Sequence, residues 1–166
     1  MKTGVWLLAL AAIVSALWLA GTTGPNWAPD IQFKDTSGKT LSINELRGKP
    51  MLVTFWATTC SSCIREIPDL IKLYEEFAPD GFGVIAVAMH YDPPSHVIET
   101  ARQWQFPFPV VLDLKAELAN AFGSVEQIPT NFLIAPDGSI ARHRLGRLDL
   151  QILRPLIRNM LRKESS

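Results

Sequence analysis

Apolar runs and amphipathic spacing divide the chain into predicted strands and helices. Met51–Trp56 is apolar except at Thr54, and 84–89 is a second continuous apolar run. Runs of this length are typical of strands that are buried on both faces. Between them, apolar residues recur every three or four positions and predict an amphipathic helix. Its apolar rows contain Ile64, Ile67, Ile71 and Tyr74, flanked by Leu70, Leu73 and Phe77.

Shorter elements precede and follow this unit. Residues 31–33 and 40–41 flank a polar turn and predict a hairpin, and 44–47 predicts a helical turn that Gly48 ends. Further strands are predicted at 110–112, 130–135 and 140–145, and further helices at 97–104, at 115–122 and from Asp149, which can cap the last helix.

This order of elements predicts an α/β fold. Strands that alternate with helices form a parallel core, and a closing hairpin adds antiparallel strands. The expected architecture is a central mixed sheet flanked by helices and preceded by an N-terminal β-hairpin. Two prolines interrupt predicted helices. Pro68 is expected to kink the first helix, and Pro155 to kink the last one or delay its start.

The N-terminal segment 4–21 contains no charged residue. As a helix, its 18 residues would extend about 27 Å, near the thickness of a hydrocarbon core. Lys2 on the short flank places that side in the cytoplasm, and Trp6 and Trp18 lie near the two ends, where interfacial aromatics are common. A cleaved signal peptide needs a small residue where Trp18 or Leu19 stands. We therefore expect a retained single-pass inner-membrane helix, with the domain in the periplasm or otherwise outside the cytoplasm.

The chain is expected to consist of a membrane anchor or uncleaved signal at 1–21, a turn-rich linker at 22–29 and one globular domain at 30–166. Hydrophobic residues make up 48% of the 166 residues, which is enough for one core. Lys plus Arg and Asp plus Glu number 16 each, so the net charge is zero. Without a basic excess that could neutralise phosphates, nucleic acid is not expected as a partner.

Cys60 and Cys63 lie where the first buried strand meets the amphipathic helix. Two cysteines three positions apart on the first helical turn can close a small disulfide. The N-terminus of a helix presents unpaired N–H groups and about half a positive charge, which favours a thiolate at Cys60. Cys60 is therefore the expected attacking sulfur, and Cys63 would resolve the mixed disulfide.

Other interpretations of the cysteine pair have less support. A structural disulfide here would close only a very short loop, which constrains little of the unfolded chain. A zinc site would need two more ligands, and the histidines form no paired ligand motif. Inert buried thiols are not expected at a strand-to-helix junction. The context of the pair favours a redox-active dithiol.

The run Phe-Trp-Ala-x-x-Cys-x-x-Cys that ends at Cys63, followed by Pro68, resembles thioredoxins. A second match is Ile128-Pro129-Thr130, which precedes a predicted buried strand and a Pro-Asp-Gly turn. With the segment 106–113, the hairpin and the anchor, residues 28–162 resemble the TlpA/ResA branch of membrane-tethered thioredoxins. The resemblance implies a thioredoxin-like fold and thiol–disulfide exchange at a Cys60–Cys63 redox disulfide.

The resemblance also implies which residues would bind a client protein. Pro129 would be cis and face the disulfide, which leaves the backbone of Ile128 free to pair with an extended client peptide. Trp56, Thr59 and Thr130 are the further expected contacts with the client.

Two residues depart from the family pattern, and a third fits two roles. Thr54 stands where thioredoxin carries a buried acid that helps to move protons, and Thr59 replaces the tryptophan usual before the first cysteine. The family's central insertion often places an acid near the cysteines, and Asp92 is the closest match by position. Asp92 also precedes Pro93 and Pro94, so it can equally be a helix N-cap.

The resemblance implies an enzyme that reduces disulfides of extracytoplasmic proteins, with cytochrome c maturation clients as first candidates and a membrane thiol–disulfide donor supplying electrons. The uncharged pair Ser61-Ser62 favours a reductase over a strong oxidant. No cofactor and no metal are expected. An alternative from another class is a metal-binding or copper-delivery module in which the cysteines are joined by a distant histidine such as His143. A peroxidase of the same fold would need its reactive cysteine in another motif, which is absent.

Overall fold

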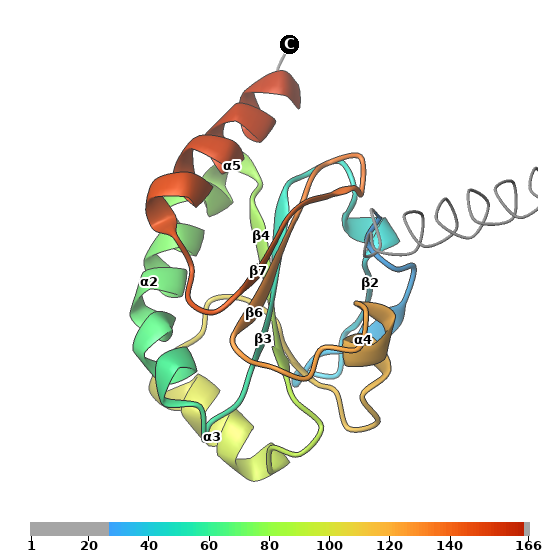
Figure 1. Cartoon of the computed structure of the whole chain (residues 1–166), viewed down its shortest axis with the longest axis vertical. Coiled ribbons are helices and arrows are strands. Elements are labelled where there is room, and N and C mark those ends of the chain that lie inside the picture. The colour runs from blue at the N-terminus through green and yellow to red at the C-terminus, as the bar shows by residue number, and fades with distance from the viewer. Residues whose placement is uncertain (1–26, 165–166) are drawn as a thin grey trace, which may run out of the picture.

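The computed structural model describes residues 27–164, in which a five-stranded sheet is covered by helices on both faces (Figure 1). The strand order is β5 (Val110–Leu112), β4 (Gly83–Ala88), β3 (Met51–Trp56), β6 (Thr130–Ile134) and β7 (Ile140–Leu145). β3 is parallel to β4 and β4 to β5, whereas β6 is antiparallel to both β3 and β7. The predicted mixed sheet is confirmed.

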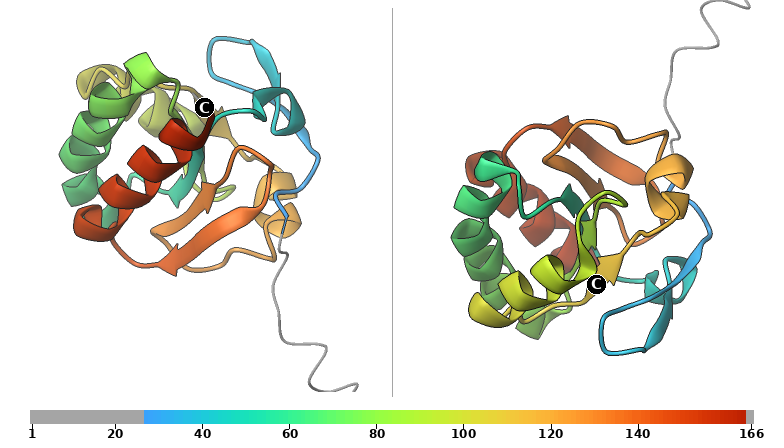
Figure 2. Two further views of the ribbon diagram at one scale, coloured as in Figure 1. Left: turned by 90° about the horizontal axis from the view of Figure 1, so that it is seen from above. Right: turned by 90° about the horizontal axis from the view of Figure 1, so that it is seen from below.

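Alternating side chains of β3 supply the cores on the two faces of the sheet. Leu52 and Trp56 pack on the face covered by helices α2, α3 and α5, whereas Val53 and Phe55 pack toward α4 and the N-terminal hairpin. Figures 1 and 2 show the first group of helices on one side of the sheet and α4 on the other. The helices are α2 (Ser61–Phe77), α3 (Pro94–Gln103), α4 (Glu117–Ala121) and α5 (Leu150–Glu164).

The N-terminal hairpin forms a separate two-stranded sheet, as predicted. Its inward side chains, Phe33 and Leu41, join the core on the α4 face. The hairpin and the two short 3-10 turns are β1 (Gln32–Lys34), β2 (Thr40–Ser42), η1 (Asn44–Leu46) and η2 (Ala78–Asp80).

Two helices begin at positions that differ from the prediction, each for a local reason. α3 begins at Pro94 rather than at residue 97, and proline is favourable in the first turn of a helix because its missing N–H would be unpaired there. α4 begins at Glu117 rather than at residue 115. The Asp113 carboxylate accepts the N–H groups of Leu118 and Ala119 at 3.0 and 2.8 Å, and these bonds fix where α4 starts.

Both long helices continue through their internal prolines. α2 includes Pro68 and α5 includes Pro155. α5 begins at Leu150, so the expected delayed start at Pro155 is wrong. The cause is the cap: the Ile152 N–H donates to the Asp149 carbonyl at 3.1 Å and lies 3.4 Å from its carboxylate, which starts the helix ahead of the proline.

The expected membrane anchor at 1–21 lies outside the described residues, as does the predicted linker up to residue 26. Within 27–164, no helix is both long enough and apolar enough to cross a membrane. The first described residues already contact the fold. Trp27 forms a β-bridge with Ser139, and the Ala28 N–H donates to the Gly138 carbonyl at 2.9 Å.

Candidate active site

Cys60 and Cys63 form a disulfide at the N-terminus of α2. Cys60 is the N-cap residue, and its N–H donates to the Ala57 carbonyl at 3.1 Å, which closes the turn between β3 and α2. The Cys60 sulfur accepts the Cys63 N–H at 3.2 Å and lies 3.2 Å from the Ser62 hydroxyl. A backbone donor, a hydroxyl and the positive end of a helix therefore surround this sulfur, which favours a thiolate after reduction.

The two cysteines differ in their access to solvent. Cys60 is half-buried at the end of the turn, whereas only 4% of Cys63 is exposed. An external disulfide can therefore reach the Cys60 sulfur first. This arrangement agrees with Cys60 as the attacking sulfur and Cys63 as the resolving one.

The loop before β6 contains the expected cis peptide bond between Ile128 and Pro129. The Thr130 hydroxyl donates to the Gln127 carbonyl at 2.6 Å, and the Gly146 N–H donates to the Pro129 carbonyl at 2.7 Å. The half-buried Ile128 packs against the same core cluster as Cys60. This loop, called the cis-proline loop below (127–130), is thus held from within and by the segment that follows β7.

The residues expected to bind a client differ in exposure. Thr59 is exposed beside Cys60, and Ile128 is half-buried. Trp56 and Thr130 are buried, with 4% and 3% of each residue exposed. The centroids of the Trp56 and Phe106 rings lie 5.5 Å apart, and the Trp56 indole N–H has no hydrogen-bond partner. This side chain therefore contributes to the interior wall of the site.

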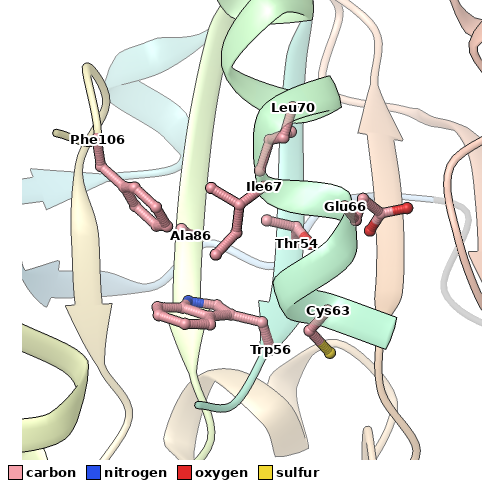
Figure 3. A pocket seen from close by; sticks show the side chains of 8 residues that line it. All are labelled: Thr54, Trp56, Cys63, Glu66, Ile67, Leu70, Ala86 and Phe106. Atoms are coloured by element: carbon pink, nitrogen blue, oxygen red, sulfur yellow. The ribbon is translucent and has the colours of Figure 1, made fainter. Parts of the chain in front are cut away.

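Glu66 is a site residue that the sequence reasoning missed. It lies one turn beyond Cys63 on α2, and both side chains line a small cavity together with Thr54 and Trp56 (Figure 3). The cavity encloses about 10 Å³, near the minimum that one water molecule requires. Only 4% of Glu66 is exposed, and burial raises the pKa of its carboxyl above the ordinary value. The backbone N–H of Leu148 donates to this carboxylate.

The sequence does contain a signal for Glu66. Cys63, Glu66, Ile67 and Leu70 share one face of α2, and all four are buried. An acid within the apolar row of an amphipathic helix, three positions after a cysteine, is unusual because buried carboxylates are costly. Thr54, where thioredoxin carries an acid, lines the same cavity, so Glu66 supplies from α2 a carboxylate that β3 lacks.

Asp92 ties the loop after β4 to the turn before Cys60. Its carboxylate accepts the Thr58 N–H and the Thr58 hydroxyl, both at 2.6 Å, and only 3% of Asp92 is exposed. The N-cap of α3 is Pro93, and no side chain caps this helix. The interpretation of Asp92 as the helix cap is therefore wrong, because its carboxylate points to Thr58 instead.

His143, the histidine considered for metal binding, lies on β7 and packs against a phenylalanine. His143 is exposed on β7, and its ring stacks on that of Phe132 with 4.3 Å between centroids and 2° between planes. Among the side chains described in residues 27–162, no group of three or more His, Cys, Asp or Glu is arranged to hold a metal ion.

Comparison with known proteins agrees with this site. The model of the AhpC/TSA family matches residues 26–143. The thiol-disulfide oxidoreductase ResA of Geobacillus thermodenitrificans (strain NG80-2) is 31% identical over 154 residues, which cover 89% of this chain and 87% of the relative. The chain belongs to the AhpC/TSA family.

Further similarities place this member of the AhpC/TSA family more closely. ResA of Bacillus subtilis (strain 168) is 29% identical, covering 89% of this chain and 85% of its own. A thiol:disulfide interchange protein of the thioredoxin family from Chlorobium tepidum TLS superposes with a TM-score of 0.74 at 27% identity, covering 85% of this chain and 99% of the other. With the Cys60–Cys63 disulfide, these findings show a thioredoxin-like fold and a ResA-like thiol–disulfide oxidoreductase.

Proposed function

We propose that this oxidoreductase reduces disulfides of client proteins outside the cytoplasm. In the reduced enzyme, the Cys60 thiolate attacks one sulfur of a client disulfide, and the other client sulfur leaves as a thiolate. The Cys63 sulfur then attacks Cys60 and breaks the mixed disulfide, so the second client sulfur leaves. Two electrons have passed to the client, and the enzyme holds the Cys60–Cys63 disulfide described above.

The observation that carries this mechanism is the buried carboxyl of Glu66 beside Cys63. A buried thiol must lose its proton before it can attack, and burial alone opposes this loss. Glu66 lines the same cavity and has a raised pKa, so its carboxylate can take the Cys63 proton and return it later. Asp92 holds Thr58 and thereby the turn that presents Cys60, which makes Asp92 a positioning residue.

We also propose that the N-terminal segment anchors the protein in a membrane next to its redox partners. The uncharged segment 4–21 supports a single-pass anchor in the inner membrane, with the domain in the periplasm or otherwise outside the cytoplasm. An anchor would hold the oxidised enzyme near a membrane thiol–disulfide donor that returns two electrons to it. The resemblance to membrane-tethered thioredoxins supports proteins of cytochrome c maturation as clients.

Trapping tests the roles of both sulfurs in one experiment. In the full chain with Cys63→Ser, a model disulfide substrate should remain attached to Cys60 as a stable mixed disulfide. Cys60→Ser is the matched control and should capture nothing. Capture by the Cys60→Ser variant, or no capture by Cys63→Ser, would contradict the proposed order of attack.

A further inference from the structure

We propose that three arginines, one at the start of α2 and two next to the cis-proline loop, recruit clients that carry acidic residues next to their disulfide. This arginine rim consists of Arg65, Arg144 and Arg147. The inference rests on the proposed function, because it concerns which disulfides the enzyme reduces. It does not alter the chemistry assigned to the cysteines.

The neutral chain is divided into two parts of opposite charge. Residues 142–164, which form the end of β7 and α5, contain seven Lys and Arg but only two acids. Residues 27–141 contain eight Lys and Arg and fourteen acids. The positive charge of the domain is thus concentrated in its C-terminal unit, although the total charge of the chain is zero.

One end of this basic unit reaches the cis-proline loop. The Arg144 guanidinium Nε donates to the Arg147 carbonyl at 2.6 Å, which folds the segment 144–147 into a compact turn. Between the two arginines, the Gly146 N–H donates to the Pro129 carbonyl, and the Gly146 carbonyl accepts the Asn131 side-chain N–H at 3.1 Å. Arg144 and Arg147 therefore flank the residue that touches the cis-proline loop.

The third arginine of the rim comes from α2. Arg147 forms an ion pair with Asp69 at 3.4 Å, which joins the segment after β7 to α2. Arg65 is exposed and lies one turn before Asp69, so it shares that face of the helix. Arg65 is also two residues from Cys63, close to the positive N-terminal end of α2.

Few acidic side chains neutralise the positive charge of the arginine rim. Asp69 is partly exposed, and exposed ion pairs of this length contribute little, so Arg147 can exchange Asp69 for another carboxylate. Glu66 lies close enough to Arg147 for their charges to attract, but it is buried and accepts the Leu148 N–H. Among residues 27–162 no acid lies within ion-pair distance of Arg65 or Arg144. The basic residues Arg154 and Arg158, by contrast, both pair with Glu76.

Charges at the rim of a binding site mainly affect how fast a partner meets the protein and how the partner is oriented when it binds. They raise the association rate of partners with opposite charge, and salt suppresses the effect. A client with Asp or Glu beside its disulfide would be drawn to the rim while its sulfur approaches Cys60. A client with Lys at the same positions would be repelled, so the rim would select among disulfides of equal reactivity.

Two model peptides can test this selection with the full chain in a non-ionic detergent. The peptides share one disulfide and differ only in two Glu or two Lys residues next to it. At an ionic strength of about 0.01 M, the reduced enzyme should react several-fold faster with the Glu peptide. The preference should vanish at about 1 M, where charges are screened within about 3 Å. Equal rates at low salt would overturn the inference.

Variants assign the effect to the rim. Arg144→Gln with Arg147→Gln should abolish most of the preference, and Arg65→Gln, which removes an exposed side chain, should reduce it without disturbing the turn. Arg158→Gln on α5 is the matched control, because it removes the same charge beside Glu76, which lies about 20 Å along α2 from Cys63. An equal loss in Arg158→Gln would show an effect of net charge alone and contradict the proposal.

Two further outcomes separate failure of the proposed function from failure of client selection by the rim. If neither peptide is reduced, the proposed function fails rather than the rim. If both peptides react equally while vesicles rich in anionic lipid bind the wild type but not the double variant, the rim faces a membrane surface and client selection is excluded.

Discussion

Cys63 and Glu66 line one small cavity from successive turns of α2, so that a buried carboxyl stands beside the buried resolving sulfur. The spacing of three residues places both side chains on the same face of the helix. Burial raises the pKa of Glu66, which brings its proton exchange closer to neutral pH. In this arrangement the half-exposed Cys60 sulfur attacks the client disulfide, whereas the buried Cys63 sulfur needs a base before it can resolve the mixed disulfide.

Glu66→Gln should slow the resolving step. Glutamine can still accept the Leu148 N–H, so the helix keeps this contact, but it cannot take the Cys63 proton. Because general acid–base groups typically contribute a factor of about 10² or more, stopped-flow measurements should show release of the mixed disulfide slowed by roughly that factor. Glu75→Gln, which removes an exposed acid of the same helix, is the control and should leave release unchanged.

Glu66 should also make stability depend on pH in a particular direction. A carboxyl whose pKa is raised by folding contributes its stability fully below the unfolded value of 4.5, and this contribution is lost as pH rises through the folded pKa. Denaturant titrations from pH 4 upward should therefore show Glu66→Gln gaining stability relative to the wild type as pH rises. A difference between the two proteins that stays constant with pH would contradict a raised pKa.

Asp92→Ala should loosen the turn before Cys60. The Thr58 N–H and hydroxyl would lose their acceptor, and an unsatisfied buried donor costs about 1–3 kcal/mol in the free energy of unfolding. Thr58→Val, which removes only the hydroxyl, should cost less. Asp92→Asn should leave the pH profile of mixed-disulfide release in place, because the proton acceptor is Glu66. A shift of that profile in Asp92→Asn would instead make Asp92 a proton carrier.

The contrast between Asp92 and Glu66 shows what the sequence alone could and could not predict. Apolar runs identified four strands of the main sheet, the Pro-Asp-Gly turn identified β7, and the cysteine and proline motifs located the site, because these features depend on local residue patterns. The partner of Asp92 could not be predicted, since Thr58 lies 34 positions away and meets it only when β3 and β4 pair. Glu66 could have been found from its place in the apolar row of α2, but its partner could not, because the Leu148 N–H that its carboxylate accepts lies 82 positions away.

Cys60 should react with alkylating reagents faster than Cys63 in the reduced protein. Its sulfur is more accessible and accepts the Cys63 N–H, whereas Cys63 is buried next to a carboxyl. Mass spectrometry after a short pulse of iodoacetamide at pH 7 should find the label on Cys60, with a rate difference on the order of tenfold. Equal labelling, or faster labelling of Cys63, would reverse the assigned roles.

The reduction potential decides the direction of exchange, and we expect the value of a reductase. Stabilising the Cys60 thiolate stabilises the reduced form and makes the protein more oxidising. Ser61 and Ser62 between the cysteines carry no charge, so the thiolate is stabilised only by the Cys63 N–H, the Ser62 hydroxyl and the helix end. Buried Glu66 beside Cys63 lowers the reduction potential, because negative charge near the sulfurs disfavours thiolates and so disfavours the reduced form.

Equilibrating the full chain with glutathione buffers at pH 7 should give a midpoint closer to about −270 mV than to about −120 mV. A midpoint near the second value would make the protein a donor of disulfides to its clients.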